Sequence, residues 1–249
     1  MNGKLYITAT PIGNLSDITH RALETLKEVD FVLCEDTRVT KKLLDKYEIK
    51  TPTISYHQHS DAKKIKEIKG LLNEGKNLAL VTDAGTPGIS DPGNLLIHEI
   101  LKTEGILRQT QDDSEEVKTG KPHLTSPQEG EGLKIIPIPG ASAVISALSI
   151  SGFPTDKYTF MGFPPNKNKR LKYFKEVADS KYAVAFYESS HRIKKCLDNL
   201  KNVLESNRQI VIGRELTKLH ESIYRGTIDE ILEMNIKEKG EFVVVVSSK

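Results

Sequence analysis

Short apolar runs alternate with stretches of helical periodicity from the start of the chain, and this alternation limits the folds that are open to it. Residues 4–9, 30–35, 52–56, 77–82 and 134–138 form apolar runs of strand length. Between most of these runs, apolar residues recur every three or four positions, which is typical of helices that bury one face. Strands separated by helices predict a mainly parallel sheet with helices on both faces.

The helices expected between these strands differ in how clearly they begin. Ser16 is a candidate N-cap for a helix that runs to Val29. Three more helices are expected, over residues 37–47, 61–73 and 95–102.

The chain beyond the segment SGFPTD (151–156) is denser in strands, and we expect a domain boundary there. The predicted domains are residues 1–152 and 153–249. The final apolar run, FVVVV, would be apolar on both faces of a sheet, which predicts a central strand. Two domains of comparable size imply a cleft between them.

One stretch of the first domain does not follow this pattern. Residues 105–132 contain very few large apolar side chains, so they cannot bury enough surface to offset the entropy lost on ordering. We therefore expect a flexible insertion there.

Composition excludes several classes of protein. No apolar run reaches the roughly 18 residues of a membrane span, and the N-terminus lacks the pattern of a secretory signal, so we expect a cytoplasmic protein without membrane contact. Cys34 and Cys196 lie far apart outside any cysteine or histidine cluster, which predicts neither a disulfide nor a metal site. Residues 157–249 hold 18 Lys and Arg against 12 Asp and Glu, a positive balance that is compatible with nucleic-acid binding.

Three loops rich in glycine and proline follow predicted strands of the first domain: TATPIGN (8–14), TDAGTPGISDPG (82–93) and PIPGASA (137–143). Ligands of open α/β sheets bind at the carboxyl ends of the strands, and such loops let the main chain approach a ligand closely. None of the three matches a dinucleotide-binding or Walker motif. Taken singly, each loop could equally be a tight turn.

These loops, together with FYESSHR (186–192) and GRELTK (213–218), resemble the 16S ribosomal RNA cytidine-2′-O-methyltransferase family, a branch of the tetrapyrrole-methylase superfamily. The resemblance covers nearly the whole chain except residues 104–132. It implies two α/β domains, the first with a mainly parallel sheet and the second with a mixed or antiparallel one, with S-adenosylmethionine in the cleft between them. It also implies a homodimer that methylates a cytidine 2′-hydroxyl in the decoding region of the small ribosomal subunit.

Carried over motif by motif, the resemblance implies a set of cofactor contacts. The sulfonium of the cofactor is positively charged, so carboxylates and backbone carbonyls are expected near it. The implied residues are Pro11, Asp83, Ala84, Gly85, Thr86, Ile89, Ser142, Ala143, Tyr187, Glu188 and Leu216. Asp83 could equally cap the turn that follows it.

Methyl transfer to a hydroxyl requires close alignment and removal of a proton. The candidate proton acceptors are Glu188, Glu215, His191 and Lys218, in no order that the sequence justifies. His57 and His59 are too few for a metal site, and we expect no metal.

RNA contacts are expected to be mainly ionic and therefore salt-dependent. The candidates lie in a basic segment that begins at residue 166 and beside the motifs of the second domain: Lys167, Lys169, Arg170, Arg192, Arg214 and Lys218. A solvated helix face is the alternative for the basic segment.

Three other functions are compatible with parts of the sequence. A tetrapyrrole or diphthine methyltransferase would share the fold and cofactor, but tetrapyrrole enzymes usually have a glycine-rich first loop that TATPIG lacks. A non-catalytic RNA-binding or assembly factor would not need intact cofactor loops. A nucleotide hydrolase would need a phosphate loop or an acidic metal cluster.

Overall fold

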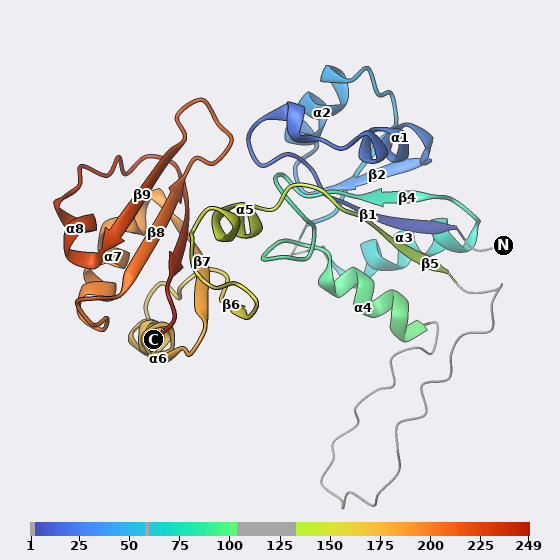
Figure 1. Cartoon of the computed structure of the whole chain (residues 1–249). Coiled ribbons are helices and arrows are strands. Elements are labelled where there is room, and N and C mark those ends of the chain that lie inside the picture. Colours follow the sequence, from blue (N-terminus) through green and yellow to red (C-terminus); the bar gives the residue numbers. More distant parts are fainter. Residues whose placement is uncertain (1–2, 58–59, 104–132) are drawn as a thin grey trace, which may run out of the picture. The chain divides into compact units, whose positions relative to one another are not determined.

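The computed structural model describes residues 3–57, 60–103 and 133–249, which form two compact units. Unit 1 comprises the chain up to residue 10 and residues 18–140, and unit 2 comprises residues 11–17 and 141–249. The two units are described separately below. The elements, labelled in Figure 1, are β1 (Lys4–Thr8), α1 (His20–Glu28), β2 (Phe31–Cys34), α2 (Thr37–Lys46), β3 (Thr53–Ser55), α3 (Ala62–Asn73), β4 (Leu78–Leu80), α4 (Asn94–Thr103), β5 (Lys134–Ile138), α5 (Ala143–Ser149), β6 (Tyr158–Phe160), α6 (Arg170–Asp179), β7 (Ala183–Ser189), α7 (Ile193–Lys201), β8 (Gln209–Arg214), β9 (Ser222–Thr227), α8 (Ile228–Glu233) and β10 (Glu241–Val246), with short 3-10 helices at Leu15–Asp17 and Ser190–Arg192.

Unit 1 is built on a parallel sheet with strand order β3-β2-β4-β1-β5. Helices α1 and α2 cover one face, where residues such as Leu26 and Leu43 pack against Val32 and Ala79. Helices α3 and α4 cover the other face (Figure 1), where Ile68 packs against the strand side chains that point away from α1 and α2. Both faces are therefore buried, which confirms the expected parallel sheet.

The first helix begins later than the sequence suggested. Thr19 is its N-cap, because its side-chain oxygen accepts a hydrogen bond of 3.1 Å from the N–H of Ala22. Ser16 lies instead in the short 3-10 helix, where its N–H donates to the side chain of Asn14. The prediction of Ser16 as the N-cap was wrong because a second hydroxyl residue lies closer to the helical N–H groups.

Unit 2 is built on a mixed sheet with strand order β6-β7-β10-β8-β9. Only the β6–β7 pair is parallel, and the other three pairs are antiparallel. The apolar strand β10 lies in the middle, as its sequence predicted. Helices α6, α7 and α8 pack on one face of this sheet, with Phe174, Phe186 and Phe242 among the buried side chains.

Helix α5 covers the other face of the unit 2 sheet. Val144, Ala147 and Leu148 pack there against Val211 and Val243. The sequence placed the domain boundary after this helix, at residue 152, whereas the contacts of α5 group it with unit 2. The expected insertion at 105–132 lies outside the described residues.

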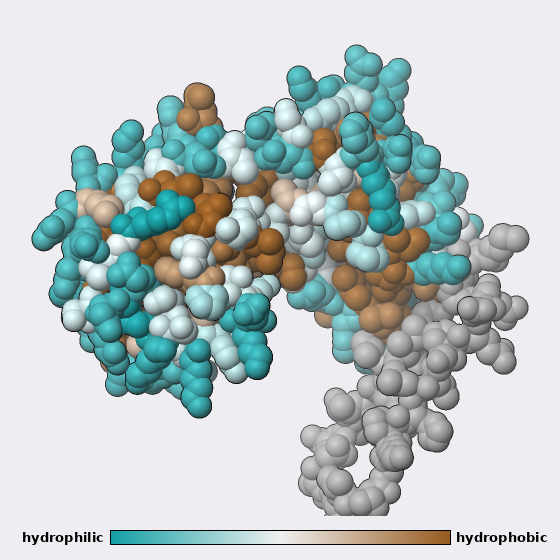
Figure 2. Space-filling view, viewed as in Figure 1, coloured by the Kyte–Doolittle hydropathy of each residue, from teal (hydrophilic) through white to brown (hydrophobic). Residues whose placement is uncertain are grey.

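Hydrophilic side chains cover much of the outer surface of each unit in the view of Figure 2. No helix in the described ranges is long and apolar enough to cross a membrane.

A buried ionic cluster joins the end of β7 to the start of α6 in unit 2. The carboxylate of Glu188, 1% exposed, accepts from Arg170 Nη2 at 3.1 Å and pairs with Arg192 Nε at 2.8 Å. Arg170 is 5% exposed, and its other nitrogens donate to Asn199 and to the carbonyl of Pro165. The buried carboxylate of Glu188 therefore has two ionic partners, and the buried guanidinium of Arg170 has hydrogen-bond acceptors for its nitrogens, as burial requires.

Arg170→Met is expected to lower the free energy of unfolding by about 3–5 kcal/mol, because the substitution leaves the buried Glu188 with one of its two ionic partners missing. Lys172→Met on the same helix is the matched control. Lys172 forms only an exposed pair with Glu176 at 3.8 Å, so its loss should cost less than about 1 kcal/mol. Urea unfolding of both variants measures the difference, and similar losses in the two would contradict a structural role for the cluster.

Candidate functional site

The carboxyl edge of the unit 1 sheet brings the three glycine- and proline-rich loops together. They leave strands β4, β1 and β5, which are neighbours in the sheet and run in the same direction. The loops after β1 and β4 are tied by two backbone hydrogen bonds between Thr10 and Gly85, of 2.8 and 3.1 Å. The loop after β1 is also tied to β5, because the N–H of Ala9 donates to the carbonyl of Ile138 at 3.1 Å.

Two glycines of the second loop hold backbone conformations that other residues adopt only with strain. Gly85 has a φ of 85° and Gly88 a φ of 83°, in the left-handed region that favours glycine. A third glycine, Gly140, allows close approach of the chain, because a Cβ there would lie 3.0 Å from the Cβ of Ala9. The loops therefore have a fixed shape in which main-chain groups can face a ligand.

Two buried hydroxyl groups lie at this edge without a hydrogen-bond partner among the described residues. Thr8 is 0% exposed and ends β1, and Thr82 is 2% exposed and follows β4. Most buried hydroxyl groups are paired, so these two are exceptions among the described residues. Nothing in the sequence distinguished them from ordinary strand residues.

Acidic residues gather at the same edge, after β2 and β4. The side chain of Asp83 accepts a hydrogen bond of 3.2 Å from the N–H of Asp36 rather than capping its own turn. Arg38 binds both carboxylate oxygens of Asp36, at 3.0 and 2.7 Å, and these hydrogen bonds lower the pKa of Asp36 to about 2. Partial burial raises the pKa of Asp83, and so does the neighbouring charge of Asp36. Asp36 and Glu35 were not among the predicted site residues, although acids directly after a buried strand could have indicated them.

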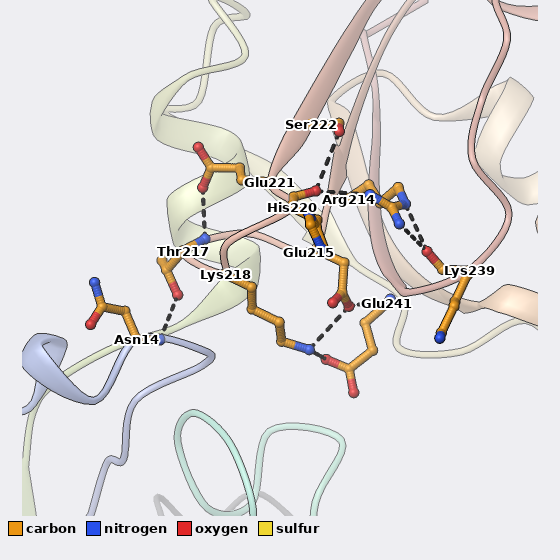
Figure 3. Close-up of polar contacts among 10 residues, drawn as sticks. All are labelled: Asn14, Arg214, Glu215, Thr217, Lys218, His220, Glu221, Ser222, Lys239 and Glu241. Atoms are coloured by element: carbon orange, nitrogen blue, oxygen red, sulfur yellow. Dashed lines mark hydrogen bonds and ion pairs between the residues drawn. The ribbon is translucent and has the colours of Figure 1, made fainter.

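The motif GRELTK forms a braced turn in unit 2, drawn in Figure 3. The ammonium of Lys218 pairs with Glu215 at 3.0 Å and with Glu241 at 2.9 Å. Glu215 and Thr217 have φ angles of 51° and 66°, so the turn stores backbone strain that these contacts offset. The hydroxyl of Thr217 accepts the N–H of Asn14 at 3.1 Å, which ties the loop after β1 to the turn.

These ion pairs shift the pKa values of Lys218 and Glu215, two of the candidate proton acceptors. Although burial opposes it, hydrogen bonds to Glu241 and Glu215 raise the pKa of Lys218, which favours the charged ammonium. Burial raises the pKa of Glu215, but hydrogen bonds from the backbone of Glu241 and from Lys218 outweigh burial, and the pKa is lowered. Lys218 is therefore held as an ammonium, which cannot accept a proton, and Glu215 is a weaker base than an ordinary carboxylate. The role of both residues in the structure is to brace the turn.

The other two candidate proton acceptors differ in exposure. Glu188 lies in the buried cluster with both oxygens engaged by arginines. His191 is exposed, in the short helix that precedes α7. Of the four candidates, His191 alone forms no ion pair with another described residue.

Predicted cofactor residues lie in both units. Asp83, Ala84, Gly85, Thr86 and Ile89 share the second loop of unit 1. In unit 2, Leu216 is buried beside Ile12, and Tyr187 packs against Phe160 and Phe163 with ring centroids 5.0 and 5.4 Å apart. The remaining unit 2 candidates are Pro11, Ser142, Ala143 and Glu188. The shared cleft for these residues stays a prediction.

The predicted RNA-binding residues divide into buried and exposed groups. Arg170 and Arg214 are both 5% exposed and donate to partners inside unit 2, Arg214 to the carbonyls of Lys239 and His220. Arg192 and Lys218 are held in ion pairs. The structure therefore shows protein partners for these four, and their contact with RNA stays a prediction. Lys167 and Lys169 are exposed.

No group of three metal-binding side chains lies within reach of one ion in the part of the chain that the structure describes.

Comparison with known proteins identifies the family. The sequence profile of the Tetrapyrrole (Corrin/Porphyrin) Methylases matches residues 4–107 and 123–232. A protein of Thermotoga maritima named ribosomal RNA small subunit methyltransferase I is 41% identical over 99% of both chains. A protein of the same name from Halalkalibacterium halodurans is 42% identical over 98% of this chain and 75% of its own length.

Solved structures agree on the fold. A uroporphyrin-III-C-methyltransferase from Thermus thermophilus superposes with a TM-score of 0.62 at 13% identity, over 98% of this chain and 94% of the other. The methyltransferase CobJ gives a TM-score of 0.65 at 17% identity, over 99% and 94% of the two chains. Together with the parallel sheet of unit 1 and the mixed sheet of unit 2, these matches confirm the expected fold class. This chain is a methyltransferase of the tetrapyrrole methylase family, in the group whose curated relatives are named ribosomal RNA small subunit methyltransferase I.

Proposed function

We propose that this chain transfers a methyl group from S-adenosylmethionine to the ribose 2′-hydroxyl of cytidine 1402 in 16S ribosomal RNA. The observation that carries the proposal is the 41% identity, over 99% of both chains, to the Thermotoga maritima protein named for small-subunit ribosomal RNA methylation. We further expect a homodimer that acts in the cytoplasm on the small ribosomal subunit, as the family resemblance implies.

The edge of the unit 1 sheet is suited to such a cofactor. The left-handed Gly85 and Gly88 give the loop after β4 a shape that exposes backbone groups, and the unpartnered hydroxyl of Thr82 lies where that loop begins. A carboxylate at Asp83 is compatible with a positive sulfonium nearby, because opposite charges attract most strongly where water is scarce. Asp83, Ala84, Gly85, Thr86 and Ile89 would hold the cofactor from unit 1, and Pro11, Ser142, Ala143, Tyr187 and Leu216 from unit 2.

The bound cofactor supplies an electrophilic methyl group, so the protein has to position the ribose and keep water out with its own residues. It must hold a ribose oxygen about 3 Å from the methyl group, in line with the bond that breaks. It must keep water away, and it must take up one proton. No metal is required for these tasks.

RNA binding is proposed to rest on exposed lysines that are free of ion pairs within the described residues. Lys167 and Lys169 meet this condition, on the segment that leads into α6. Their contacts would be with phosphates, which position the RNA without reading its sequence. Specificity for one cytidine would then come from RNA shape and from a base held out of its stack.

Transfer of a labelled methyl group from S-adenosylmethionine tests the function directly. The acceptors to compare are 30S subunits that lack ribose methylation, free 16S RNA and uroporphyrinogen. We expect label at one cytidine ribose, located by mass spectrometry of RNA fragments. Label on the tetrapyrrole, or none on either RNA, would refute the proposal.

Ala84→Arg is expected to weaken binding of S-adenosylhomocysteine by at least about tenfold, because a long side chain would fill the loop after β4. Ala84 is exposed, so the fold should be unaffected, whereas a side chain at the left-handed Gly85 would also strain the backbone. Ala62→Arg, at the exposed start of α3, is the control. Titration calorimetry measures both, and equal affinities would remove this loop from the cofactor site.

The double substitution Lys167→Gln and Lys169→Gln is expected to weaken RNA binding and to reduce the slope of log Kd against log salt by about 1.5. Two α7 lysines already held in ion pairs, Lys194 and Lys201, provide a control with the same change of charge. Filter binding at several salt concentrations separates the two double variants. The same slope in both double variants would show that the basic segment is a solvated helix face and does not contact RNA.

A further inference from the structure

Glu35 lies at the carboxyl edge of the unit 1 sheet. It follows β2, the strand between β3 and β4. Leu33 is in register with Leu80 of β4, and the N–H of Val81 donates to the carbonyl of Leu33. Glu35 is the bend residue directly after β2, and Asp83 begins the turn after β4, so both lie at the carboxyl edge of the sheet.

The neighbour on the other side of Glu35 is defined in the same way. Leu33 is in register with Ile54 of β3, and the N–H of Tyr56 donates to the carbonyl of Cys34 at 2.8 Å. Tyr56 is buried in the same apolar cluster as Leu33 and Leu80. The segments that follow β2 and β3 therefore leave the sheet side by side.

The carboxylate of Glu35 is half-buried and has no hydrogen bond or ion pair with another described residue. The N–H of the next residue, Asp36, donates to the side chain of Asp83 at 3.2 Å, which holds the end of β2 against the start of the loop after β4. A carboxylate without a partner among the described residues therefore lies at the edge where ligands of parallel sheets bind.

Charged groups from three elements surround Glu35. Asp83 follows β4, His57 follows β3 and Asp36 precedes α2, with Arg38 of α2 paired to Asp36. Burial is the main cause that raises the pKa of Glu35, Asp83 and Asp36 raise it further, and His57 opposes them. A carboxylate with a raised pKa is a stronger base while it is still ionised near neutral pH.

Glu35 also differs from the acids and bases considered in unit 2. Glu188, Glu215 and Lys218 are each held in ion pairs with opposite charges. Glu35 has no such partner among the described residues, and it lies next to the loop that starts at Asp83.

We propose that Glu35 is the general base that takes the proton from the attacking ribose hydroxyl, an inference that rests on the proposed function. The O–H bond breaks, and its proton passes to a carboxylate oxygen of Glu35. The electron pair of that bond stays on the ribose oxygen, which bonds to the methyl carbon as the carbon–sulfur pair leaves with sulfur. Glu35 then returns its proton to water.

The test compares Glu35→Gln, Glu35→Asp and Glu24→Gln, the last on the exposed side of α1. Glu35→Gln should lower kcat about 100-fold or more, with the affinity for S-adenosylhomocysteine within about twofold of wild type. Glu35→Asp, which keeps a carboxylate, should recover at least about tenfold of that loss, and Glu24→Gln should match wild type. Thermal unfolding checks that each variant is folded.

The pH dependence of kcat provides a second test. A base must be ionised to act, so wild-type kcat should fall as the pH drops through the raised pKa of Glu35, at a pH above the usual 4.5. Glu35→Gln should lack this limb. Carbon-13 NMR of labelled glutamate should show one resonance with the same midpoint, without any turnover, and that resonance should vanish in Glu35→Gln.

The outcomes separate the two proposals. Wild-type protein that methylates no RNA would refute the proposed function. Active wild type with a Glu35→Gln kcat within about threefold of it, or with a loss confined to KM, would overturn only the assignment of Glu35. An NMR midpoint at or below 4.5 would overturn it as well.

Discussion

The parallel pairing of five short strands is the constraint on which unit 1 depends. Parallel strands must return through helices, so all five carboxyl ends lie on one edge and all the connecting helices lie on the two faces. Backbone hydrogen bonds between the loops after β1 and β4, and between the loop after β1 and β5, then hold this edge in one shape. The predicted cofactor residues of unit 1 and the proposed base all belong to that edge.

Unit 2 depends on a different interaction, the pairing of opposite charges at a strand end and in a turn. Glu188 is matched by Arg170 and Arg192, and Lys218 is matched by two glutamates. These pairs fix the strand end and the turn that carry Tyr187 and Leu216. The motif FYESSHR therefore contains buried residues that hold the end of β7 in place as well as the predicted cofactor residue Tyr187.

Much of the fold follows from local pattern. The five strands of the first unit and the central place of β10 were predicted, because strand periodicity and apolar content are local properties of the chain. Helix starts were less certain, since Ser16 and Thr19 are equally good caps in composition and only the chain path selects between them. The grouping of α5 with unit 2 was not predicted, because a helix between two sheets has no local signal for the one that it will cover.

The sequence by itself determined the alternation of strands and helices, the order of the loops and the family of methyltransferases to which they belong. Only the tertiary structure decided which charged side chains form ion pairs within the protein and which stay exposed. Lys169 and Arg170 are neighbours in the chain, yet one is exposed and the other is buried against Glu188. The position of Glu35 near Asp83 was also decided there, because strand order and register join residues that no local pattern relates.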